Sequence, residues 1–117
     1  FGDTSGEQCQ WHTGMDAQHI TDLMLGARGF IGIDSGMTHV AGLLGVPAVA
    51  IHSHLPPQLL WSYTNVRAIT PDTNCVFCRW LPKNGWTPLC DRACSAMATI
   101  APQRVLEVFQ SLLEGKQ

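Results

Sequence analysis

The chain has 117 residues, a formal net charge of -2 and a pI of about 6.2. This length gives room for one compact domain over residues 1–117, and the ordinary apolar share with few charged residues excludes disorder and a coiled coil. The seven basic residues are scattered, which disfavours nucleic acid and anionic membranes as partners, and no apolar stretch reaches the roughly 20 residues that span a bilayer.

The first half of the chain alternates between helical and strand patterns. Asp16 is placed to cap a helix over residues 16–28, and apolar residues recur there at the three and four spacing of one buried face: Ile20, Leu23, Met24 and Ala27. Residues 30–33 form a short apolar run typical of a strand covered on both faces. A second helix begins near Met37 and ends at Gly45.

Strands are predicted next over residues 46–51 and 66–70, with Trp61 and Tyr63 between them expected to cover the sheet edge. The chain closes with a helix over residues 101–113, whose apolar side carries Val105, Val108, Phe109 and Leu112. Helices that alternate with buried strands indicate an α/β fold, in which a Rossmann-like parallel sheet is flanked by crossover helices.

The turn from the first strand into the second helix is the most informative segment. Asp34, Ser35, Gly36 and His39 lie where ligands bind in an open parallel sheet, beyond the carboxyl end of a strand. The start of a helix offers unpaired N–H groups and a positive dipole end to a phosphate. On spacing alone, the same residues also suit a plain helix cap with a half-buried histidine.

The run FIGIDSGMTHVAGLLGVPAVA over residues 30–50 resembles the signature of glycosyltransferase family 9, the bacterial ADP-heptose heptosyltransferases and their relatives. The resemblance implies a two-domain enzyme of the GT-B type, in which a C-terminal Rossmann-like domain binds the nucleotide sugar. This chain would then be the second half of that C-terminal domain.

The resemblance also assigns a donor-binding set: Met15, Asp34, Ser35, Gly36, Met37 and His39. It implies that backbone N–H groups of Ser35 and Gly36 hold the donor diphosphate, that Asp34 bonds sugar hydroxyls, and that Met15 lies beside the base. The implied reaction is an inverting transfer from an ADP-heptose-like nucleotide sugar to a saccharide or lipid-linked saccharide acceptor. It requires no metal and belongs to lipopolysaccharide synthesis in the bacterial cytoplasm.

Family members carry their general base, a carboxylate, in the N-terminal domain, and a basic diphosphate-binding residue early in the C-terminal domain. This sequence shows neither region, so we place no catalytic residue in the chain. We expect a partial domain that is inactive alone, with one sheet edge covered by a missing N-terminal part or by self-association.

Residues 74–95 form a cysteine-rich module within the domain. Two close pairs could close a tetrahedral site for structural zinc or iron: Cys75, Cys78, Cys90 and Cys94. Disulfides and free thiols are the competing interpretations. The module also supports an alternative function, a non-enzymatic metal-stapled module that presents Arg79, Trp80 and Lys83 to a protein or nucleic acid.

Overall fold

The order of elements matches the α/β pattern expected from the sequence. The computed structural model describes residues 9–33, 35–52, 63–72 and 96–115. Its elements are α1 (Ala17–Gly26), β1 (Phe30–Ile33), α2 (Gly36–Leu44), β2 (Ala48–Ile51), β3 (Val66–Ile69), η3 (Met97–Thr99) and α3 (Pro102–Leu113). The short η3 helix is the one element in these ranges that the sequence patterns did not predict.

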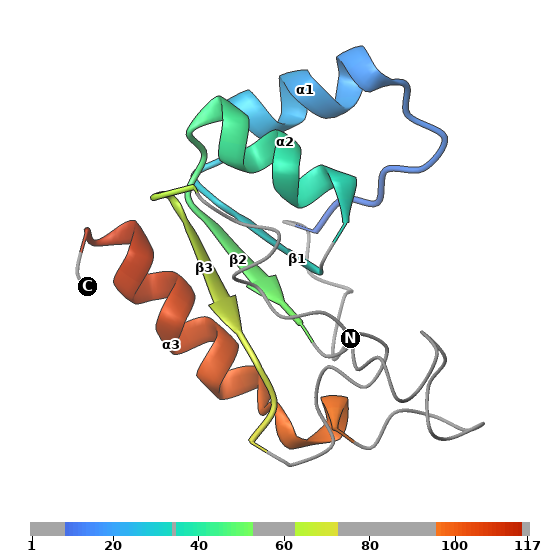
Figure 1. Ribbon diagram of the computed structural model, residues 1–117. Coiled ribbons are helices and arrows are strands. Elements are labelled where there is room, and N and C mark those ends of the chain that lie inside the picture. Colours follow the sequence, from blue (N-terminus) through green and yellow to red (C-terminus); the bar gives the residue numbers. More distant parts are fainter. Residues whose placement is uncertain (1–8, 34, 53–62, 73–95, 116–117) are drawn as a thin grey trace, which may run out of the picture.

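The three strands form one parallel sheet in the order β1-β2-β3. Figure 1 shows α1 and α2 on one side of this sheet and α3 on the other. In the register, Ile33 at the end of β1 lies beside Ile51 of β2, which in turn lies beside Ile69 of β3. All three strands therefore point their carboxyl ends at the same edge, where α2 begins.

Two small hydrophobic clusters hold the layers together, one on each face of the sheet. Toward α1 and α2, the buried residues are Met24, Ala41, Val46 and Ala48. Toward α3, they are Val49, Ile69 and Val105. Because neighbouring strand residues point to opposite faces, Ala48 and Val49 serve different clusters. The predicted apolar side of α3 is confirmed, since Val108, Phe109 and Leu112 pack against the second cluster.

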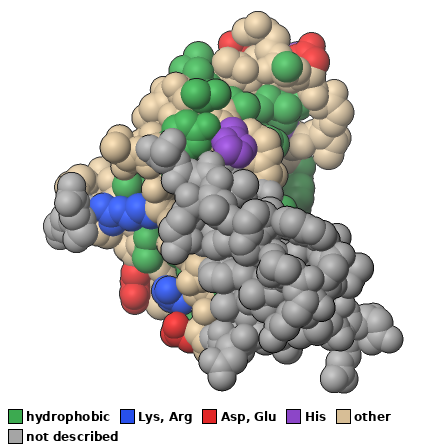
Figure 2. Space-filling view, viewed as in Figure 1, with side chains coloured by type: hydrophobic (Ala, Val, Ile, Leu, Met, Phe, Trp, Pro, Cys, Tyr) green, Lys and Arg blue, Asp and Glu red, His purple; other side chains and the backbone are tan. Residues whose placement is uncertain are grey.

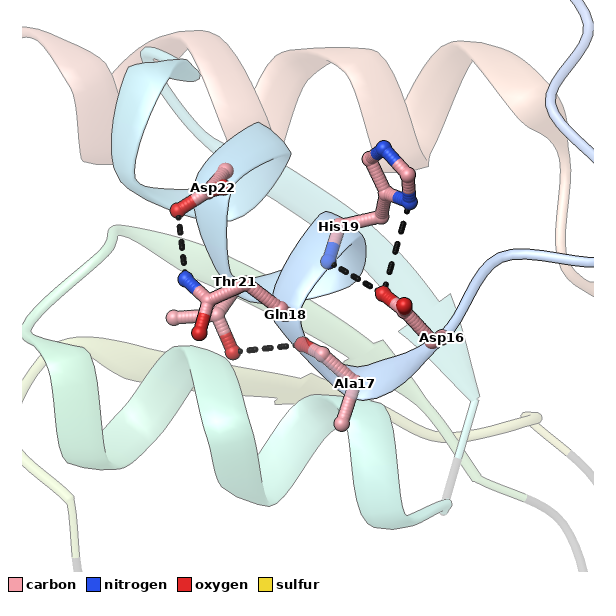
Figure 3. Close-up of polar contacts among 6 residues, drawn as sticks. All are labelled: Asp16, Ala17, Gln18, His19, Thr21 and Asp22. Carbon is pink, nitrogen blue, oxygen red and sulfur yellow. Dashed lines mark hydrogen bonds and ion pairs between the residues drawn. The ribbon is translucent and has the colours of Figure 1, made fainter.

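Helix α1 is capped as predicted but ends earlier and is less buried than expected. The Asp16 carboxylate accepts a hydrogen bond from the His19 N–H at 2.9 Å and lies 3.3 Å from the His19 ring nitrogen (Figure 3). The helix ends at Gly26 because Ala27 is already extended toward β1. Of the face predicted to be buried, Met24 is buried, whereas Leu23 is 43 % exposed. The α1 helix packs on α2 at the outside of the fold (Figure 1), so it buries little of its own surface.

Two of the predicted strands also differ from expectation. We predicted a β1 covered on both faces, but it lies at the edge of the sheet with Ile31 and Ile33 exposed. Strand β2 begins at Ala48 rather than at residue 46. Two local reasons explain the later start: the Val46 N–H is bonded to the Ala41 carbonyl, and Pro47 has no N–H to give to a sheet.

The junction between β1 and α2 is closed by a single carbonyl group. The Ile33 oxygen accepts hydrogen bonds from the Ser35 N–H at 2.8 Å and from the Thr38 hydroxyl at 2.6 Å. Thr38 is fully buried in the first turn of α2. The two bonds fix the direction in which the helix leaves the strand.

The far end of α2 is held by a left-handed glycine and by a side chain from the segment before β3. Gly45 has φ of 75° and its N–H bonds to the last turn of the helix, which confirms the predicted stop. The Asn65 amide donates to the carbonyls of Ala41 at 3.1 Å and Val46 at 2.7 Å. Both ends of α2 are thus fixed to the sheet or to its connections.

The buried side of α2 is made of small residues, Ala41 and Gly42 among them. Tyr63 lies against this helix, and a Cβ atom at Gly42 would come within 2.4 Å of the Tyr63 ring. We expected Tyr63 to cover the sheet edge, and the structure shows it packed on α2 instead. Gly42 is therefore required by the close approach of an aromatic ring.

We predict that Gly42→Ala destabilises the fold, although alanine is the better helix former. Overpacking of this kind costs about 1–3 kcal/mol, and the helix propensity of alanine returns only ~1 kcal/mol of it. Gly26→Ala is the matched control, because a Cβ there meets nothing within 4 Å. Urea unfolding should show a lower midpoint for the Gly42 variant alone, and equal midpoints would contradict the packing described.

We also predict that Thr38→Val lowers the free energy of unfolding by about 1 kcal/mol, because the Ile33 carbonyl loses the hydroxyl donor that the buried Thr38 provides. Thr21→Val is the control, since the Thr21 hydroxyl makes an equivalent bond to the Ala17 carbonyl on an exposed helix (Figure 3). Its effect should stay within about 0.5 kcal/mol. A Thr38 variant as stable as wild type would show that the junction does not depend on this hydroxyl.

Candidate functional site

The sequence-predicted residues of the strand-to-helix turn come together at the start of α2. Ser35 is the N-cap, Gly36 and Met37 form the first turn, and His39 lies one turn after Ser35. Asp34, which we expected to bond sugar hydroxyls, lies outside the described residues. The turn sits at the carboxyl end of β1, on the edge of the sheet where parallel folds bind ligands.

Backbone hydrogen bonds decide which donors this turn presents. The Ser35 N–H is bonded to the Ile33 carbonyl, and the Thr38 N–H is bonded to the Ser35 carbonyl at 3.1 Å. The resemblance assigns the Ser35 N–H to the donor diphosphate, but in the structure this N–H is already hydrogen-bonded within the protein. The first turn of a helix leaves the N–H groups of Gly36 and Met37 without intrahelical partners. The Ser35 side chain makes no capping bond in the described structure, so its hydroxyl is not used by the helix.

His39 is half-buried and lies against Tyr63. Its Nδ1 is 2.9 Å from the Tyr63 hydroxyl, and the two rings meet edge to face with centroids 5.8 Å apart. The spacing of His39 in the turn was visible in the sequence, but the contact with Tyr63 was not. The two residues are far apart in the chain and meet because residues 63–65, just before β3, pack against α2.

Two further members of the predicted donor-binding set, Met15 and Met37, line one apolar pocket. It has a volume of about 250 Å³ and lies between α1, the start of β1 and the start of α2. Its lining includes Met15, Ile20, Leu23, Met24, Phe30 and Met37. Met15 also lines a neighbouring pocket of about 380 Å³ together with His12 and His19. The structure thus brings Met15 and Met37 to one hollow, although they come from different elements.

The cysteine-rich module cannot be placed in the same way. Its four candidate metal ligands lie outside the described residues: Cys75, Cys78, Cys90 and Cys94. The zinc or iron site therefore stays a prediction.

The charge distribution of the surface is mixed. Figure 2 shows the basic side chains apart from one another on the face in view, and hydrophobic side chains over the α1 and α2 region. The exposed apolar residues of this region include Leu23, Leu25, Leu43 and Leu44. In the part of the chain that the structure describes, no helix has the length and apolar character needed to cross a membrane.

Comparison with known proteins agrees with the motif at the turn. Neither a curated protein nor a solved structure matches the chain. The model of glycosyltransferase family 9 (heptosyltransferase) matches residues 13–83, a span that holds Met15, the whole strand-to-helix turn and Tyr63. Because this match covers more than half of the 117 residues, the chain belongs to glycosyltransferase family 9.

Proposed function

We propose that this chain provides the nucleotide-sugar-binding part of a family 9 glycosyltransferase, as the second half of a GT-B C-terminal domain. The observation that carries the proposal is the turn at the start of α2, where Ser35, Gly36 and His39 lie together at the carboxyl end of β1. Membership of the family implies a nucleotide sugar and an acceptor as partners.

The donor diphosphate binds over the first turn of α2. Its oxygens accept hydrogen bonds from the N–H groups of Gly36 and Met37 and from the Ser35 hydroxyl, while the helix dipole favours the negative charge. His39 lies on the same side one turn further along, where an imidazole N–H reaches the phosphate or the sugar. This assignment replaces the Ser35 N–H by that of Met37, because the former is bonded to Ile33.

The apolar pocket beside this turn accommodates the nucleoside. Met37 connects the two regions, since it belongs to the first turn of α2 and also lines the pocket with Met15. Methionine side chains adapt to flat aromatic surfaces and make favourable sulfur contacts with them. A base beside Met15 and a diphosphate at Gly36 would then be held by neighbouring parts of one surface.

In the complete reaction, an acceptor hydroxyl oxygen forms a bond to the anomeric carbon as the bond from that carbon to the diphosphate oxygen breaks. The hydroxyl proton passes to a carboxylate base, which we assign to no described residue of this chain. The start of α2 stabilises the charge that develops on the departing nucleoside diphosphate, and this help is electrostatic. An ADP-heptose-like donor and a lipopolysaccharide acceptor are the substrates that the resemblance favours.

The sharpest test of this site is Gly36→Ala, followed with ADP-glucose, GDP-mannose and UDP-glucose. A Cβ at Gly36 meets no protein atom within 4 Å, so the fold should be unaffected. A diphosphate lying against that backbone would meet the new methyl group, and we expect affinity to fall by about tenfold or more. Amide chemical shifts during titration measure both properties. Gly26→Ala is again the control and should bind as wild type does.

His39→Ala should weaken binding of the same nucleotide sugar by about 5- to 30-fold, the cost of one hydrogen bond to a charged group. The amide shifts that the ligand causes should centre on Ser35 to His39 in the wild-type chain. If none of the three nucleotide sugars moves these signals at millimolar concentration, the proposed donor site is wrong. Shifts confined to the region around His12 and His19 would place the ligand in the neighbouring pocket instead.

A further inference from the structure

Tyr63 reaches the candidate site from a different part of the chain. It precedes β3, yet its hydroxyl oxygen lies 2.9 Å from Nδ1 of His39 on α2. The edge-to-face arrangement, with an interplanar angle of 79°, lets the phenol oxygen meet the ring nitrogen while the aromatic carbons pack on the helix. Tyr63 therefore contacts the Nδ1 edge of the histidine that the proposed donor site uses.

The position of the Tyr63 ring is fixed by its surroundings. Gly42 lies one turn after His39 on the same side of α2, and its missing side chain leaves the space that the ring occupies. Two residues further along the chain, Asn65 bonds to the carbonyls of Ala41 and Val46 at the end of the same helix. The Tyr63 carbonyl accepts a hydrogen bond from the Val66 N–H at the start of β3. The phenol ring is thus packed on α2, while the Tyr63 backbone is tied to the start of β3.

A fixed phenol beside Nδ1 can hydrogen-bond to that nitrogen in either histidine tautomer, as a donor to a bare Nδ1 or as an acceptor from Nδ1–H. A tyrosine hydroxyl can donate to Nδ1, in which case the ring keeps its own proton on Nε2. Phosphate oxygens at neutral pH accept hydrogen bonds, so only a ring nitrogen that carries a proton is useful to them. The Nε2–H tautomer is the form in which a neutral His39 donates toward a diphosphate.

We infer that Tyr63 is a positioning residue that holds His39 in its Nε2–H tautomer and in one ring orientation. Gly42 leaves the space in which the tyrosine ring packs. Tyr63 acts through His39 and not on the ligand. The inference deepens the proposed function and rests on it for the identity of the ligand. The arrangement of the three residues itself is present without any ligand.

The experiment records long-range proton–nitrogen spectra of the histidine rings in the ligand-free 117-residue chain. It is done at mildly alkaline pH, and the spectra themselves report which ring nitrogens carry a proton. Wild-type His39 should show a protonated Nε2 and an Nδ1 that accepts a hydrogen bond. A protonated Nδ1 in the wild-type spectrum overturns the inference without any variant.

Tyr63→Phe keeps the aromatic ring over Gly42 and removes only the hydroxyl, so the amide spectrum should show an intact fold. The His39 Nδ1 signal should move toward that of a solvent-exposed ring, while the signals of exposed His12 and His19 stay in place. Unchanged His39 ring shifts would show that the hydroxyl does not set its tautomer.

Affinity for ADP, GDP and UDP then separates this inference from the proposed function. Tyr63→Phe should weaken the nucleoside diphosphate that binds wild type by about 3- to 10-fold. Changed ring shifts with unchanged affinity would overturn the positioning role for the donor. If wild type binds none of the three nucleotides, the proposed function fails, while the ring spectra of the ligand-free chain still decide whether Tyr63 controls His39.

Discussion

The Ile33 carbonyl is the group on which the arrangement of the site depends. It ends β1, and it receives both the Ser35 N–H and the buried Thr38 hydroxyl. A strand end normally exposes its last carbonyl to solvent or to a ligand, but here the carbonyl ties the following helix to the sheet. The direction of α2, and with it the set of N–H groups that face outward, is fixed by these two hydrogen bonds.

The C-terminal end of α2 is also held by hydrogen bonds, but from other groups. Gly45 turns the chain in a left-handed conformation, and the Asn65 amide bonds both to the Ala41 carbonyl in the last turn and to the Val46 carbonyl just after the helix. Tyr63 then lies along the helix between its two fixed ends. A helix of nine residues is too short to be stable in isolation, so these tertiary contacts are what make it a rigid support for the first turn.

Sequence patterns predicted the helices and strands better than they predicted how deeply each one is buried. The order of helices and strands, the Asp16 cap, the Gly45 stop and the apolar side of α3 could be read because each depends on local spacing. The exposure of Ile31 and Ile33 could not, because an apolar run looks the same at the edge of a sheet as in its centre.

In the candidate site, too, local features were predicted from the sequence and long-range contacts were not. Ser35, Gly36 and His39 are neighbours in the sequence and were predicted from it, whereas the contact of His39 with Tyr63 depends on the packing of a distant residue against α2. The Ser35 N–H was assigned to a ligand because the sequence does not show which backbone groups the turn itself will consume. The only local signal for Tyr63 was Gly42, whose lack of a side chain has a reason that only the fold reveals.

The two hydrophobic clusters on opposite faces of the sheet support different helices, one α1 and α2 and the other α3. Val49 and Ile69 face α3, while Val46 and Ala48 lie on the face toward α1 and α2. Alternation along β2 assigns neighbouring residues to different faces. The side chains that support α2 and those that support α3 therefore meet only through the backbone of the strands, and repacking one face leaves the side chains of the other in place.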